Sequence, residues 1–165
     1  MRIRKKIISL ITLCLAFLML VMPVKAAEKE YIQVDGSYLT DATTSKGTTN
    51  SGITTRGTHL MDGECSITKS GVGRIYVYAS TTANHDVDYI STVIYVEQYN
   101  EKTGVWEQID CWQVEDRSTY YVSTSKMMIV DRGYYYRVHA DHVAGMTADY
   151  PYDDAYSFTD GILIN

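Results

Sequence analysis

The side chains best suited to binding a metal ion gather around residue 140. His139, Asp141 and His142 lie within one short stretch, and imidazole and carboxylate groups are common zinc ligands. In an extended strand, however, His139 and Asp141 share one face while His142 points to the other. A structural zinc site takes four ligands, so this stretch would need help from His59 or His85. We therefore expect ordinary polar residues here, with no metal ion or other cofactor.

Acidic side chains suggest a calcium site in two further places. Residues 84–88 begin like a calcium-binding loop, but Tyr89 stands where the sharp turn of such a loop requires glycine. Asp149, Asp153 and Asp154 surround a proline in a predicted loop, and carboxylates grouped in this way can hold an extracellular calcium ion loosely. A solvated acidic loop is the simpler interpretation, and it is the one we expect.

Patterns that would indicate catalysis are missing from the sequence. Glycosidases need two carboxyl groups about 5–10 Å apart, and nothing places two of the 20 acidic residues opposite each other. Serine hydrolases of one large class carry a Gly-x-Ser-x-Gly turn, which does not occur here. We therefore expect a protein that is not an enzyme, with a small extracellular hydrolase as the third choice of function.

Two cysteines follow the N-terminal leader, Cys65 and Cys111. Outside the cytoplasm such a pair can form a disulfide, which would stabilise the fold by about 4 kcal/mol for a loop of this length. The alternative is two separate buried thiols that act as small apolar side chains. A catalytic cysteine is not expected, because neither lies beside a recognisable histidine partner.

Tyrosine is unusually frequent, with 15 in the chain. In strands with alternating side chains, Tyr76, Tyr78 and Tyr135 would all point outward. Exposed rings at every second position can form a flat surface for sugar rings or a protein partner. The alternative is that these rings pack over both sheets and leave only their hydroxyl groups in water.

The first 26 residues resemble an export signal. Basic residues precede an apolar run from Ile7 to about Met22, and small residues follow, which is typical of a secretory signal peptide cleaved after Ala26. A membrane anchor is the alternative, because the run is only slightly shorter than the roughly 20 residues that span a bilayer. We expect a secreted protein with no membrane contact after cleavage.

Cleavage there would change the charge of the chain. It removes five basic residues and no acidic one, so the remaining 139 residues carry 10 basic and 20 acidic side chains, a formal charge of −10. Nucleic acids and anionic lipid surfaces bind proteins through Lys and Arg. We therefore expect neither as a partner, and regard an extracellular glycan or protein as possible partners.

The spacing of apolar residues predicts strands. Residues 75–80 alternate between apolar and other side chains, as a half-buried strand does. Residues 89–99 and 105–114 flank turn residues and predict a hairpin, and further strands are expected at 120–130, 134–143 and 156–164. Residues 27–58 are expected to hold an edge strand at 31–34 and then a flexible segment rich in Thr, Ser and Gly, while residues 59–165 should form a single antiparallel β-sandwich.

Residues 134–140 resemble the sixth strand of fibronectin type III-like sandwiches, a group close to immunoglobulin-like folds. In that pattern Tyr134, Tyr136, Val138 and Ala140 point inward, and Tyr134 occupies the position of the tyrosine corner. Residues 94–106 resemble the third strand and the Trp-bearing strand after it. The resemblance implies a fold and says nothing of activity.

Several motifs together, including Asp35-Gly36, residues 59–67 and residues 73–78, resemble a family of small uncharacterised secreted proteins of Gram-positive bacteria, a domain of unknown function. That resemblance implies a compartment and a host type. Our leading hypothesis is a secreted, non-catalytic binding module for cell-wall glycan or a protein partner. The alternative is a secreted effector or bacteriocin-like toxin.

Overall fold

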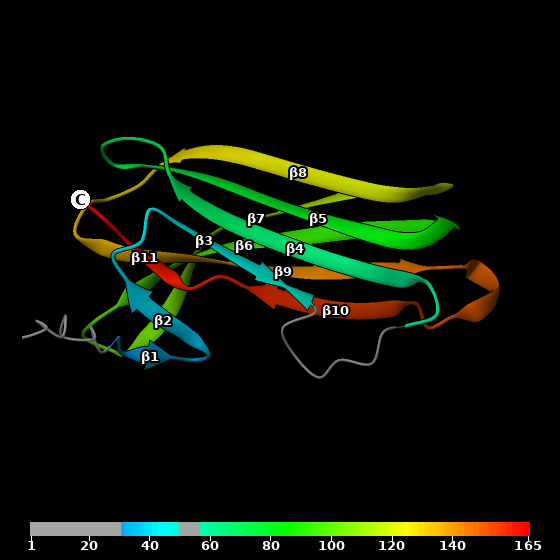
Figure 1. Cartoon of the computed structure of the whole chain (residues 1–165), viewed down its shortest axis with the longest axis horizontal. Coiled ribbons are helices and arrows are strands. Elements are labelled where there is room, and N and C mark those ends of the chain that lie inside the picture. Colours follow the sequence, from blue (N-terminus) through cyan, green and yellow to red (C-terminus); the bar gives the residue numbers. More distant parts are fainter. Residues whose placement is uncertain (1–30, 50–56) are drawn as a thin grey trace, which may run out of the picture. The chain divides into compact units, whose positions relative to one another are not determined.

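The computed structural model describes residues 31–49 and 57–165, which form two packed β-sheets (Figure 1). Apart from 3-10 conformation at Thr49 and in the turn Thr147–Asp149, the elements within these residues are all strands. The predicted all-β body of two packed sheets is therefore confirmed. The signal peptide expected for residues 1–26 lies outside the described residues. Within the described part of the chain, no helix has the length and apolar character needed to cross a membrane.

Within residues 31–49 and 57–165, eleven strands make up the two sheets. In chain order they are β1 (Gln33–Val34), β2 (Ser37–Thr40), β3 (Thr44–Thr48), β4 (Leu60–Lys69), β5 (Arg74–Val87), β6 (Tyr89–Asn100), β7 (Val105–Asp116), β8 (Thr119–Ile129), β9 (Tyr134–Gly145), β10 (Asp153–Phe158) and β11 (Gly161–Ile164).

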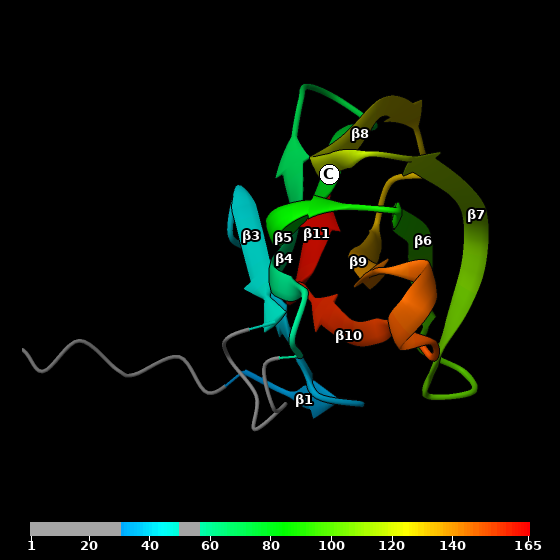
Figure 2. The same cartoon turned by 90° about the vertical axis from the view of Figure 1, so that its right-hand side faces the viewer.

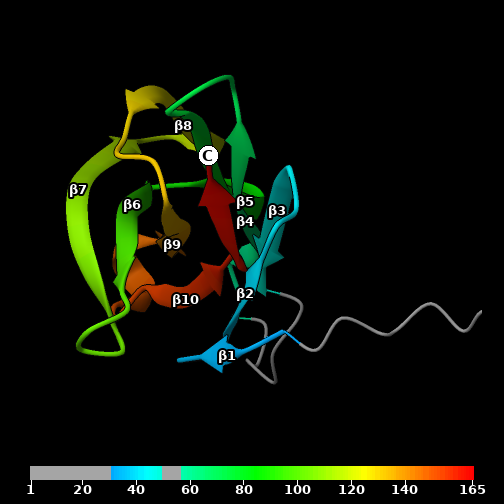
Figure 3. The same ribbon diagram turned by 90° about the vertical axis from the view of Figure 1, so that its left-hand side faces the viewer.

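The four-stranded sheet has the order β3-β4-β5-β8, and the seven-stranded sheet has the order β1-β2-β11-β9-β6-β7 with β10 also paired to β9. Viewed along the strands, β3, β4, β5 and β8 form one layer (Figure 2). Strands β7, β6, β9 and β10 curve around the other side (Figure 3). Strand β9 is the centre of the larger sheet, because β6 covers one of its edges while β11 and β10 share the other.

The core lies between the two sheets and follows the predicted alternation. On β5, Ile75 and Val77 are fully buried, and on β9 the same holds for Val138 and Ala140. Burial of such apolar side chains from both inner faces is the main force that holds a sandwich together. The predicted β6–β7 hairpin is also present, and its turn ends at Gly104, whose φ of +71° suits glycine.

The ordered body begins earlier than the sequence indicated. We expected a flexible segment up to residue 58 and a domain starting at His59, but Thr44–Thr48 forms β3 and pairs with β4. The segment lacks apolar residues, yet its β-branched threonines favour strands, and backbone hydrogen bonds to β4 hold it. Gly47 is required here, because a side chain at this position would collide with the main-chain carbonyl of Phe158. Residues 50–56 of the expected flexible segment lie outside the described residues.

The predicted last strand, 156–164, is in fact two strands. The chain breaks at Thr159, which is buried and satisfies its polar groups internally. The backbone N–H of Thr159 donates to the carbonyl of Val138 at 2.9 Å, and the hydroxyl of Thr159 accepts from the N–H of Val138 at 2.9 Å. Ser37 completes the break by donating its hydroxyl to the carbonyl of Thr159 at 2.8 Å. After the break, β11 continues along the same edge of β9 and also pairs with β2, in parallel.

The residue at the tyrosine corner was also predicted wrongly. Tyr134 is 43% exposed, whereas Tyr136 is buried and donates its hydroxyl to the carbonyl of Asp131 at 2.8 Å. Tyr134 lies where β9 first enters the sheet, at the end of the core. Tyr136 is the first residue of β9 that the opposite sheet covers, and it therefore ties down the preceding loop.

Candidate binding surface

A row of aromatic rings crosses the outer face of the seven-stranded sheet. Tyr95 on β6 lies directly opposite His139 on β9, which in turn lies opposite Phe158 on β10. The rings of Tyr95 and His139 stack with centroids 4.9 Å apart, and those of His139 and Phe158 with centroids 4.3 Å apart. Tyr156 meets Phe158 edge to face at 5.5 Å and is 59% exposed. We call these four residues the aromatic row.

A carboxylate fixes one end of the row. Asp141 lies two residues after His139 on the same face of β9, and its Oδ1 is 3.0 Å from the Nε2 of that ring. Its other oxygen, Oδ2, accepts the hydroxyl of Tyr95 at 3.1 Å. Because both rings are stacked and hydrogen-bonded, their orientation is set before any ligand arrives.

A buried arginine supports the other end of the row. Arg137 is only 2% exposed, and its guanidinium lies 5.2 Å from the ring centroid of Phe158 and 4.6 Å from that of Trp106. Its Nε donates to Glu97 at 2.6 Å and its Nη2 to the carboxylate of Asp35 at 2.9 Å. A buried charge is tolerated only when it is paired and hydrogen-bonded in this way.

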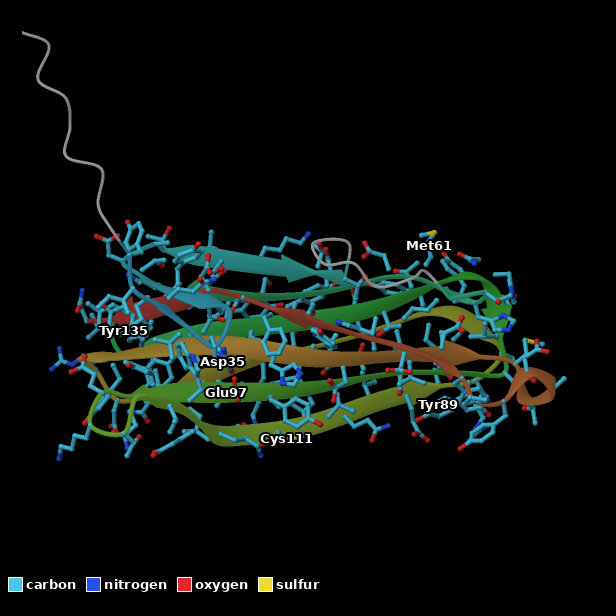
Figure 4. All side chains as sticks on the ribbon, turned by 90° about the horizontal axis from the view of Figure 1, so that it is seen from below. Asp35, Met61, Tyr89, Glu97, Cys111 and Tyr135 are labelled. Atoms are coloured by element: carbon cyan, nitrogen blue, oxygen red, sulfur yellow. The ribbon has the colours of Figure 1, made fainter. Side chains whose placement is uncertain are left out.

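The β1–β2 hairpin forms a wall beside the row. Its two-residue turn, Asp35-Gly36, has positive φ at both positions (48° and 79°), as the favoured hairpin turn requires. Together with His139, Tyr156 and Phe158, the turn lines an open hollow with a volume of about 580 Å³. Figure 4 looks onto this side of the molecule and shows Asp35 close to Glu97 over β9.

No family model, curated protein or solved structure matches this chain. The resemblances seen in the sequence, to fibronectin type III-like sandwiches and to a secreted family of Gram-positive bacteria, therefore gain no support from these comparisons. The structure shows two packed sheets, and the comparisons identify no family. The chemistry of the surface itself is then the guide to function.

The predicted tyrosine surface does not exist as one face. Tyr76 and Tyr78 lie on the outer face of the four-stranded sheet, where the hydroxyl of Tyr78 is 2.8 Å from that of Tyr121. Tyr135 lies on β9, in the other sheet. The sequence did favour outward-facing aromatic side chains, but the row that forms comes from β6, β9 and β10, whose register cannot be seen in the sequence. The Asp35-Gly36 dipeptide was a usable hairpin signal.

The candidate metal ligands have other partners. His139 and Asp141 bond to each other within the aromatic row. Asp153 accepts the backbone N–H groups of residues 59 and 60, at 2.5 and 3.0 Å, while Asp154 is exposed on β10. Among the residues that the structure describes, no three His, Cys, Asp or Glu side chains are placed to hold a metal ion.

His142 points away from the row into the core, as the alternation predicted. It is fully buried, with Nδ1 2.9 Å from the hydroxyl of Thr81 and Nε2 2.8 Å from the hydroxyl of Ser157. Burial lowers the pKa of His142 to about 4. Gly63 on β4 leaves room for the ring, since a side chain there would collide with it. The contact with Thr81 on β5 links the two sheets, whereas Ser157 lies on β10, beside β9 in the same sheet. Because both His142 and Ser157 are enclosed, this Ser–His pair cannot reach a substrate.

The two cysteines do not form a disulfide. Cys65 points into the core from β4, while Cys111 is exposed on β7, and both are free. The disulfide alternative is therefore wrong, and the alternative of two buried thiols holds for Cys65 alone. Burial raises the pKa of Cys65 to about 11. The pKa of Cys111 is also raised, first by partial burial and then by Asp110 and Asp141.

This difference predicts selective alkylation of the native protein. The thiolate is the reactive form, so iodoacetamide should modify Cys111 slowly at pH 7 and faster above pH 9. Cys65 should react more than about 100-fold slower than Cys111 until the protein is unfolded, because its exposure is limited by local opening. Peptide mass spectrometry after timed labelling measures both rates. Equal labelling of the two cysteines in the native protein would contradict this arrangement.

Proposed function

We propose that this protein is a non-catalytic extracellular β-sandwich that binds a ligand on the outer face of its seven-stranded sheet. The observation that carries the proposal is the aromatic row beside an open hollow, because exposed rings in a concave site are the usual core of a recognition surface. Tyr156 and Phe158 are 59% and 37% exposed, although burial of such large rings would stabilise the fold.

The rigidity of the surface favours binding. Asp141 orients two of the rings, and Arg137 is locked between Phe158 and the β1–β2 turn. A surface whose side chains are already ordered loses less conformational entropy when a ligand docks. If the rings served only to cover the sheet, the buried guanidinium of Arg137 would not be needed to hold the β1–β2 turn beside them.

Two features of the chain support the place and the finer fold in this proposal. The N-terminal sequence resembles a cleavable export signal. The pairing of β6 with both β9 and β7 supports a fibronectin type III-like arrangement, in which the third strand lies beside the sixth. A sandwich of this kind presents binding surfaces on a stable scaffold and carries no reaction by itself.

A binding screen tests the proposal. The purified protein is applied to a glycan array, to purified peptidoglycan and to a peptide library, together with two variants. Tyr156→Ala removes the most exposed ring of the row, and Tyr76→Ala removes a tyrosine from the opposite sheet. We expect at least one ligand class to be retained, with affinity about tenfold lower for Tyr156→Ala and unchanged for Tyr76→Ala. No retention in any arm, or equal loss in both variants, would overturn the proposal.

A further inference from the structure

We infer that the hollow beside the aromatic row binds an organic cation, namely the lysine or arginine side chain of a basic extracellular peptide. This rests on the proposed function and names the chemistry of the ligand. Three features of the hollow support it: the exposed ring surfaces, the negative charge of the surrounding carboxylates, and the hydrogen-bond acceptors that those carboxylates supply.

The rings offer surfaces that attract cations. The face of an aromatic ring carries negative partial charge and binds ammonium or guanidinium groups within about 6 Å of its centre. Phe158 already receives one guanidinium, that of Arg137, 5.2 Å from its centroid. Tyr156, at the mouth of the hollow, keeps 59% of its surface exposed, which leaves a second ring available to a cation from solvent.

The charge around the hollow is negative. Asp35, Glu97 and Asp141 contribute three carboxylates, and Arg137 is the cation among them, paired with the first two. The chain after residue 26 has a formal charge of −10, so the long-range field has the same sign. Such a field speeds the approach of cations and slows that of anions, and a neutral sugar gains nothing from it.

The charged groups at the rim accept hydrogen bonds and do not donate them. A carboxylate has about four acceptor positions and no donor when ionised, whereas a lysine ammonium has three donors and no acceptor. The oxygens of Asp141 use one acceptor position each for His139 and Tyr95, which leaves further positions for a ligand. A sugar hydroxyl both donates and accepts, and therefore matches this rim less well.

The openness of the hollow favours a side chain carried by a peptide. Its walls are the β1–β2 turn on one side and the row on the other, with a volume of about 580 Å³ open to solvent. A lysine or arginine side chain can enter with its charged end near Asp35, which lines the hollow, and on the side where Asp141 holds the ring of His139, while the peptide backbone stays outside. Binding in this mode requires no change in the sheet.

The test is a titration followed by NMR, with the Tyr156 and His139 signals as reporters. A hexapeptide containing one lysine is compared with its arginine analogue, with the same peptide acetylated on the lysine amine, and with a neutral hexasaccharide of N-acetylglucosamine. The protein variants are Asp141→Asn, which keeps an acceptor oxygen but removes the charge, and Asp86→Asn. Asp86 lies at the end of β5, three residues before Tyr89, and Figure 4 shows Tyr89 at the end of the molecule away from Asp35. Asp86 is therefore the matched control.

We expect the lysine or arginine peptide to shift both reporters at low salt. Asp141→Asn and 0.5 M NaCl should each weaken the interaction about threefold to fivefold, acetylation should weaken it at least tenfold, and Asp86→Asn should leave it unchanged. If the saccharide shifts the reporters in place of the peptides, or if peptide binding is unchanged by acetylation and by Asp141→Asn, this inference is overturned while the proposed function stands. Absence of any shift with every ligand overturns the proposed function as well.

Discussion

Arg137→Met is expected to lower the free energy of unfolding by about 3–5 kcal/mol. The substitution keeps much of the side-chain volume but removes the guanidinium that pairs with Glu97 at 2.6 Å and Asp35 at 2.9 Å. Glu97 is only 16% exposed at its side chain, so its charge would remain in the fold without its partner. The β1–β2 hairpin would also lose its main polar attachment to β9.

Urea unfolding of the wild type and three variants measures this effect. Lys126→Met breaks the Lys126–Asp110 pair, whose side chains are 48% and 26% exposed, and should cost no more than about 1 kcal/mol. Replacing both Arg137 and Glu97 by methionine should recover most of the stability, because neither charge is then left unpaired. A loss for Arg137→Met no greater than that for Lys126→Met would show that the buried guanidinium does not anchor the hairpin.

The same variant connects stability to the proposed surface. Without the guanidinium, the Asp35-Gly36 turn loses its own hydrogen bonds to β9. The flanking residues keep the backbone pairing of β2 and single contacts such as that of Ser37 with Thr159, so the wall of the hollow is held less firmly at its tip. A loosened wall must be ordered again when a ligand binds, and that ordering reduces affinity. The residue that stabilises the fold is therefore also the one that positions the binding surface.

The sequence predicted the sandwich because its inner faces follow a period of two. Val138 and Ala140 alternate with Arg137 and His139, and the structure places the first pair in the core and the second on the outer face. The alternation could not predict that Arg137 is buried. Its strand position is outward as the pattern indicated, but Trp106 and the β1–β2 turn, distant in the chain, cover it from above.

The aromatic row could not be predicted for a related reason. Tyr95, His139 and Phe158 stand far apart in the sequence, and only the registers of β6–β9 and β9–β10 bring them opposite one another. A shift of one residue in either pairing would separate the rings. The absence of a disulfide between Cys65 and Cys111 could not be predicted for the same reason, because it depends on which face of its sheet each cysteine occupies.

Acidification should destabilise the fold through His142, by about 3 kcal/mol between pH 7 and pH 4. In the unfolded chain a histidine binds its proton below about pH 6.5, whereas burial lowers the pKa of His142 in the folded protein to about 4. Between these values the unfolded state holds more protons, so stability falls as the pH falls. The contribution is complete above pH 6.5, and the loss levels off below pH 4.

The His142→Gln variant isolates this effect from the carboxylates that titrate over the same range. Glutamine can still bond to Thr81 and Ser157 but takes up no proton, so its free energy of unfolding should fall by about 3 kcal/mol less than that of the wild type over this interval. His85→Gln, at an exposed position, should keep the wild-type dependence. Parallel curves for the wild type and His142→Gln would mean that the buried imidazole accepts a proton without disturbing the contacts between the sheets. The acid sensitivity would then have to come from carboxylates on the surface.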